Sequence, residues 1–178
     1  YTRRETIILP SHTSDGYEAI VVTDANGNLY EGPDDSVPET NNRAVTPDPV
    51  LVTVLPRPDI QVASIVAPDT IDAGASGSVR FTIINQGPVA TTIPHWTDNV
   101  YLSLDDKITS DDILIGSYQN GAALNDGTVN DGTNQYTTIA GDFVVPLRFR
   151  GDVYIIVQTD SGGSMDEWPN DGNNIQRH

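Results

Sequence analysis

The stretch Tyr154-Ile155-Ile156-Val157-Gln158-Thr159-Asp160 decides the fold, because it repeats the earlier stretch Ala19-Ile20-Val21-Val22-Thr23-Asp24. Each copy follows an apolar run that ends in proline, at Pro10 and Pro146. Each terminal Asp is followed seven positions later by a Glu, and each copy closes on a pair of asparagines. The same order at a spacing of about 135 residues predicts that the chain holds parts of two similar units.

A proline-rich segment separates the two copies. In Leu55-Pro56-Arg57-Pro58-Asp59 the two prolines disfavour a helix and favour an extended connection. We therefore predict three parts: residues 1–55 as the C-terminal half of one unit, residues 56–59 as a linker, and residues 60–178 as a nearly complete second unit. Residues 50–54 are predicted to be the final strand of the first unit. The sequence of the second unit contains no counterpart of this strand, so we expect the second unit to lack its last strand.

Within the second unit the sequence predicts strands throughout. The predicted strands are rich in β-branched and aromatic residues and are bounded by Gly, Pro, Asn or Asp. They cover residues 61–66, 78–85, 99–104, 113–118, 136–145 and 152–159. No window supports an amphipathic helix. This pattern predicts an all-β chain made of immunoglobulin-like β-sandwich units in tandem.

Charge and composition exclude several function classes. The net charge is −16, with 25 acidic against 9 basic residues, so a nucleic acid would be repelled and no such partner is expected. The apolar runs are too short to insert into a membrane. The chain has no cysteine, which excludes disulfides and thiol chemistry. It also shows no signal peptide and opens within the pattern of a unit, so we expect it to be the interior of a longer secreted protein.

Several motifs of the second unit resemble the bacterial and archaeal CARDB domain, the cell adhesion related domain found in bacteria. They are Pro58-Asp59-Ile60-Gln61-Val62, the run from Val79 to Asn85-Gln86-Gly87, Trp96-Thr97-Asp98-Asn99-Val100-Tyr101-Leu102-Ser103-Leu104-Asp105, Leu114-Ile115-Gly116, and Thr159-Asp160 with Glu167 and Asn173-Asn174. The resemblance implies an immunoglobulin-like fold in large extracellular or cell-surface proteins, often in tandem arrays. It does not imply an enzyme.

Acidic and amide side chains gather at the predicted strand ends, where they suit calcium. Ca²⁺ takes six to eight oxygen ligands from carboxylates, amides, backbone and water. The candidate ligands are Asp98, Asp105, Asp106, Asp111 and Asp112 around one strand; Asp160, Glu167, Asn173 and Asn174 in the second copy of the repeat; and Asp24, Glu31, Asn41 and Asn42 in the first. The same residue types also close turns and cap backbone groups, so turn formation is an alternative interpretation of each.

Catalytic motifs are missing from the sequence. His12, His95 and His178 lie far apart without a zinc-binding spacing, and Ser76 and Ser161 lack a nucleophile-elbow context. We therefore expect a structural or adhesive scaffold and no enzyme. A carbohydrate-binding module that stacks sugars on Trp168 is the alternative, with surface glycans as partners. Because the first unit lacks its front half, we also expect pairing with neighbouring units or identical subunits, including a filament formed by strand exchange.

Overall fold

The computed structural model describes residues 2–29 and 42–178, and every regular element in them is a β-strand. The chain divides into two compact units, Tyr1–Leu55 and Pro56–His178.

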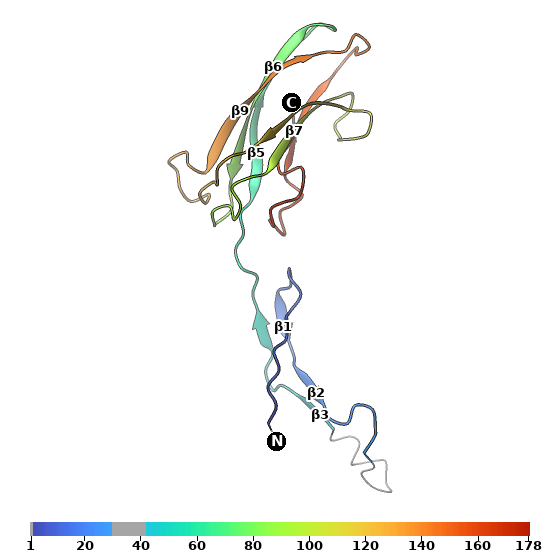
Figure 1. The fold of residues 1–178 in the computed structure, drawn as a ribbon, viewed down its shortest axis with the longest axis vertical. Helices are drawn as coiled ribbons and strands as arrows, with labels where there is room; N and C mark the ends of the chain where they lie inside the picture. Colours follow the sequence, from blue (N-terminus) through green and yellow to red (C-terminus); the bar gives the residue numbers. More distant parts are fainter. Residues whose placement is uncertain (1, 30–41) are drawn as a thin grey trace. The chain divides into compact units, whose positions relative to one another are not determined.

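The second unit is a sandwich of two antiparallel sheets (Figure 1). One sheet has the order β5–β6–β9, formed by Ile60–Val66, Ser76–Asn85 and Gln135–Val144. The other has the order β11–β10–β7–β8, formed by Ile175–Arg177, Tyr154–Gln158, Thr97–Ser103 and Ile113–Gln119. Residues of both sheets meet in one apolar core, which confirms the predicted all-β sandwich.

Alternation along β6 shows why these residues form a half-buried strand. Val79, Phe81 and Ile83 are completely buried, whereas Arg80 between them is exposed. Successive side chains of a strand point to opposite faces, so a period of two places one row in the core. From the facing sheet, Val100 on β7 contributes to the same core. Burial of this row from both sheets is what holds the sandwich together.

In its described residues, 2–29 and 42–55, the first unit forms two short antiparallel strand pairs. Strand β1, Asp15–Tyr17, pairs with β4, Val50–Val52. Strand β2, Ile20–Val22, pairs with β3, Arg43–Val45. None of this unit's described residues is buried, because no second sheet packs on these strands within it.

The two units share a local arrangement at the repeated stretch. In each, the strand that ends before the terminal Asp pairs with the strand that follows the asparagine pair. The registers correspond residue by residue: Ile20 with Val45 and Val22 with Arg43 in the first unit, Ile156 with Arg177 and Gln158 with Ile175 in the second. The amide of Thr23 donates to the carbonyl of Asn42 at 2.8 Å, and that of Thr159 donates to Asn174 at 2.9 Å.

Candidate cation-binding loop

The loop after β10 begins with a turn that Asp160 closes on itself. Asp160 has φ of 42°, in the left-handed region that Asp tolerates better than most residues. Its Oδ1 accepts a hydrogen bond from the amide of Ser164 at 2.9 Å, and its Oδ2 accepts one from Met165 at 2.8 Å. Gly163, also with positive φ, donates to the Asp160 carbonyl at 2.9 Å. The carboxylate therefore satisfies backbone donors of its own loop.

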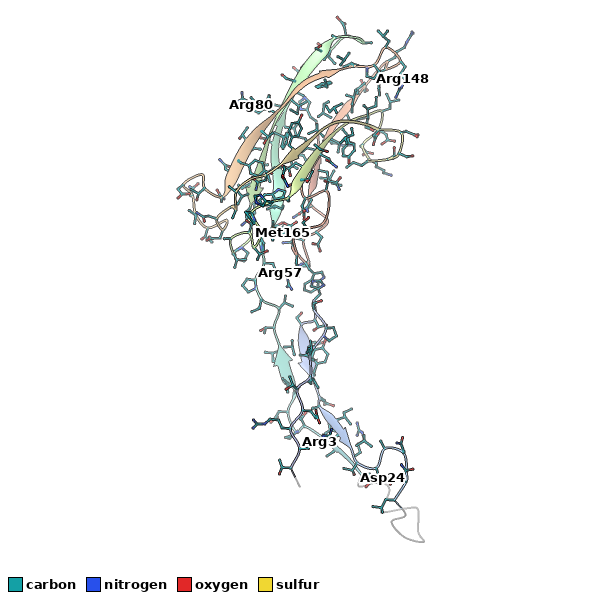
Figure 2. All side chains as sticks on the ribbon, in the orientation of Figure 1. Arg3, Asp24, Arg57, Arg80, Arg148 and Met165 are labelled. Atoms are coloured by element: carbon teal, nitrogen blue, oxygen red, sulfur yellow. The ribbon has the colours of Figure 1, made fainter. Side chains whose placement is uncertain are left out.

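Asp24 makes the same turn in the first unit. Its φ is 41°, and its two carboxylate oxygens each accept a backbone hydrogen bond at 2.8 Å, from Asn28 and Leu29. Gly27 takes the place of the positive-φ glycine and donates to the Asp24 carbonyl at 2.8 Å. Figure 2 labels Asp24 in this turn after β2, and Met165 in the second unit. In both units the terminal Asp therefore closes a turn, which is the alternative to calcium binding that the sequence left open.

Glu167 lies inside the second unit, with only 1% of its surface exposed. Its Oε1 accepts a hydrogen bond from the amide of Ile60, and its Oε2 accepts one from Asn174 Nδ2 at 2.7 Å. Burial raises the pKa of Glu167 from its ordinary value of 4.5 to about 7; the charges of Asp160 and Asp59 raise this pKa further, while the two hydrogen bonds oppose the shift. A positive ion beside this carboxylate would favour its charged form.

A pocket of about 270 Å³ opens next to Glu167. Its lining includes the acidic residues Asp160, Glu167 and Asp171. Asn174 also lines it, and the Oδ1 of Asn174 is buried without a hydrogen-bond partner. A buried carbonyl oxygen without a donor is costly, so it points to a missing donor, water or cation. Asp171, whose Oδ1 accepts from the Glu167 amide at 3.3 Å, was not among the sequence-predicted ligands.

The carboxylates of this pocket do not form a complete cage by themselves. Among residues 2–29 and 42–178, no three acidic or histidine side chains form a group that could hold a metal ion. An ion in the pocket would therefore need the Asn174 carbonyl oxygen, backbone carbonyls and water beside the carboxylates, a donor set that Ca²⁺ accepts. The residues present fit a partly hydrated site.

In the loop between β7 and β8, the acidic residues predicted as calcium ligands do not gather into one group. Asp105 Oδ1 accepts from the amide of Lys107 at 2.9 Å, and Asp112 Oδ2 accepts from that of Thr109 at 2.7 Å, so both close local turns. Asp106 pairs instead with Arg177 Nη1 at 2.6 Å on an exposed surface, and Asp111 is exposed. The structure does not bring these four carboxylates together.

Asp98 lies in the interior of the sandwich rather than at its tip. It is completely buried on β7 and accepts hydrogen bonds from the hydroxyl of Tyr136 on β9 and from Thr159 Oγ1 at 2.7 Å. Trp96 Nε1 donates to the Tyr136 hydroxyl at 3.1 Å. Burial raises the pKa of Asp98 from 3.8 to about 6, although its hydrogen bonds lower it. This network connects the two sheets.

The remaining predicted residues are placed separately. Asn173 Nδ2 donates to Asp59 Oδ1 at 2.9 Å, and Asn42 Oδ1 accepts from Thr23 Oγ1 at 3.4 Å. Glu31 and Asn41 lie outside the described residues. Trp168 is half-buried, and its amide donates to Asp166 Oδ1 at 3.4 Å. Carbohydrate binding at Trp168 stays a prediction.

The fold and the loop define a class of protein: an antiparallel β-sandwich module with polar loops at its strand ends. Among solved structures, the chain is similar to the CARDB domain of a Pyrococcus furiosus protein, crystallised in complex with di-metal ions. The match has a TM-score of 0.50 at 16% identity and covers 70% of this chain and 93% of that one. A solution structure of the same domain matches with a TM-score of 0.48 at 17% identity, covering 69% and 93%.

The similarity to the crystal structure shows that the chain shares the CARDB fold, as the sequence motifs led us to expect. No family model and no curated protein matches the sequence. In the described part of the chain, no helix is both long and apolar enough to cross a membrane.

Proposed function

We propose that this chain is a non-catalytic structural module of an extracellular or cell-surface protein, in which immunoglobulin-like units follow one another and serve adhesion. The observation that carries the proposal is the shared arrangement at Asp24 and Asp160: the same strand register, the same positive-φ turn and the same pair of carboxylate-to-amide hydrogen bonds. One supersecondary unit used twice along a chain is typical of proteins built from repeated modules.

The loop of the second unit is proposed to bind a divalent cation, with calcium as the expected ion. Its support is the buried, unpartnered Oδ1 of Asn174 beside the carboxylates of Glu167 and Asp171. A second support is that the Pyrococcus furiosus domain of the same fold was crystallised in complex with di-metal ions. The ion would join the loop after β10 to β11 and so make the end of the sandwich more rigid.

Thermal unfolding with chelator and with millimolar calcium tests the cation site. A ligand that binds only the folded state at a hundred times its Kd stabilises it by about 2.7 kcal/mol, so the melting temperature should rise by several degrees. Asp171→Asn should remove most of this rise. Asp111→Asn, the same change at an exposed position outside the pocket, should keep it. Coincident melting curves with and without calcium for the unchanged chain would reject the site.

The same proposal includes assembly through identical subunits or neighbouring units. Its support is the number of apolar side chains that the first unit leaves exposed, among them Ile8 at 94% and Leu51 at 75%. Exposed strands with such side chains associate with other strands. Light scattering tests it: a chain that assembles gives polymers that persist on dilution, whereas a monodisperse monomer at all concentrations contradicts assembly.

A further inference from the structure

Three rows of side chains cross the outer face of the β5–β6–β9 sheet. The strand register places the members of each row side by side: Val66–Arg80–Ile139, Ser64–Thr82–Thr137 and Gln61–Ile84–Gln135. None of these residues is acidic, although 25 of the 178 residues in the chain are. The only charge in the rows is that of Arg80, which Figure 2 labels on the outer side of the sheet. Loss of acidic residues with retention of arginine is typical of surfaces that contact another protein.

A groove of about 390 Å³ lies at the first of these rows. Val66 and Ile139, which are 60% and 58% exposed, contribute aliphatic surface on the two sides of Arg80. The remaining lining residues are Ala67, Pro68 and Ser78. A guanidinium binds a carboxylate through two parallel hydrogen bonds, so the group that fits this groove is a carboxylate with aliphatic neighbours.

Arg80 has no such carboxylate within its own chain. No ion pair or hydrogen bond joins its side chain to another of the residues that the structure describes. Two other arginines of the second unit do have acidic partners: Arg57 pairs with Asp166 at 3.0 Å, and Arg177 with Asp106 at 2.6 Å. On the surface of so acidic a chain, an unpaired arginine attracts the acidic surface of another copy.

The loop between β7 and β8 has the complementary chemistry. Asp111 in this loop is exposed, and its carboxylate has no ion-pair or hydrogen-bond partner among the described residues. The pairing of Leu102 with Ile113, continued by two residues, brings Leu104 to the position opposite Asp111. Leu104 is 61% exposed. The loop therefore presents an unpaired carboxylate beside an exposed aliphatic side chain.

We propose that the groove at Arg80 binds the β7–β8 loop of a second copy of this chain. Asp111 of the loop pairs with Arg80, and Leu104 packs between the aliphatic walls of the groove. The two surfaces differ and belong to opposite sheets, so each copy keeps one of them free and the contact continues from copy to copy into a filament. The inference rests on the proposed assembly of copies, to which it assigns a pair of surfaces.

Disulfide trapping tests the contact, because the chain has no cysteine of its own. Chains with Ile139→Cys are mixed with chains with Leu104→Cys and oxidised at about 0.15 M salt, where a Debye length of about 8 Å screens the repulsion between the copies. The covalent heterodimer, identified by its mass, should form at least about tenfold faster than in a control mixture. The control replaces Ile139→Cys by Ala123→Cys. All three positions are exposed, so the variants should fold.

Exchange of the two charges separates the proposed ion pair from chance collisions. Arg80→Glu in the Ile139→Cys chain should lower the rate to that of the control, and Asp111→Arg in the Leu104→Cys chain should restore it against this variant. Equal rates in the test and control mixtures overturn the proposal. A loss that Asp111→Arg fails to restore also overturns it, because Arg80 then takes its carboxylate from another partner.

Light scattering of the Arg80→Glu chain distinguishes this contact from the wider proposal of assembly. Polymers of the unchanged chain, together with Arg80→Glu chains that stay monomeric, support both. Polymers that persist in Arg80→Glu chains reject the contact at Arg80 and leave the proposed assembly in place. Unchanged chains that stay monomeric at all concentrations reject the two together.

Discussion

The strand–turn–strand segment that starts at Ile20 and the one that starts at Ile156 have the same hydrogen bonds but opposite burial. Val21 is 60% exposed, whereas its equivalent Val157 is completely buried in the core; Leu29 is 62% exposed, whereas its equivalent Met165 is only 4% exposed. The turn chemistry is local and forms in both units. Burial needs a facing sheet, which only the second unit supplies within its own residues. Hydrogen bonding in a loop and packing on a core are therefore separate properties of the same sequence pattern.

The largest difference between the equivalent segments is expected from truncating Met165 and Leu29. Met165→Ala should lower the free energy of unfolding by about 2–5 kcal/mol, because it removes core contacts and leaves a cavity. Leu29→Ala should change it by less than about 0.5 kcal/mol, as expected for an exposed side chain. Urea unfolding of the two variants measures both values. A large loss for Leu29→Ala would show that another chain buries the first unit.

Removing the turn-forming carboxylates should cause a smaller loss of stability, which should again be larger in the second unit than in the first. Asp160→Ala leaves the amides of Ser164 and Met165 without acceptors and should cost about 1–3 kcal/mol, because the amide of Met165 is buried. Asp24→Ala exposes the equivalent amides to water, which can replace the lost acceptor, so its cost should be lower. Asp160→Asn, which keeps one carbonyl oxygen, should fall between the unchanged chain and Asp160→Ala. Equal costs at Asp24 and Asp160 would contradict this explanation.

Acid should stabilise the second unit through its two buried carboxyls. The folded pKa values of Asp98 and Glu167, about 6 and about 7, lie above their ordinary values of 3.8 and 4.5. The folded state therefore binds more protons between about pH 4 and pH 7, and stability that is full below pH 4 is lost as the pH rises through 6 and 7. Melting in chelator should show a higher temperature at pH 5 than at pH 8.

Variants of Asp98 and Glu167 distinguish how much each carboxyl contributes to this pH dependence of stability. Asp98→Asn and Glu167→Gln should each reduce the slope of melting temperature against pH between 5 and 8. Calcium should reduce only the part of this slope that comes from Glu167, since Asp98 does not line the pocket. A chain whose stability rises steadily from pH 5 to pH 8 would contradict the proposed protonation of both groups.

The smallest effect is expected at the exposed ion pair of Arg177 and Asp106. Arg177 takes the position that Val45 has in the first unit, so Arg177→Val introduces the residue of the equivalent segment. Exposed ion pairs contribute about 0–1 kcal/mol, and the change in unfolding free energy should stay within that range and shrink at high salt. A loss well above this range would mean that the pair organises the β7–β8 loop.

The sequence predicted the strands of the second unit closely, but it predicted the site less well. Alternation of apolar residues determines β6, where the expected residues 78–85 lie within Ser76–Asn85. The repeat located Asp24 and Asp160 but not their role, because spacing does not reveal which oxygens already accept backbone hydrogen bonds. Asp98 was expected at a loop, yet its partner Tyr136 comes from the opposite sheet, a long-range contact that one sequence does not encode in any local pattern.

The hydrogen bond from Trp96 to Tyr136 also provides the chain with a spectroscopic probe of its own. Both tryptophans of the sequence, Trp96 and Trp168, belong to the second unit, and Trp96 is only 2% exposed. Indole fluorescence excited selectively will therefore follow the separation of the two sheets in that unit, and it will not register events in residues 1–55. A fluorescence transition and a circular-dichroism transition that fail to coincide would then report the two units unfolding independently.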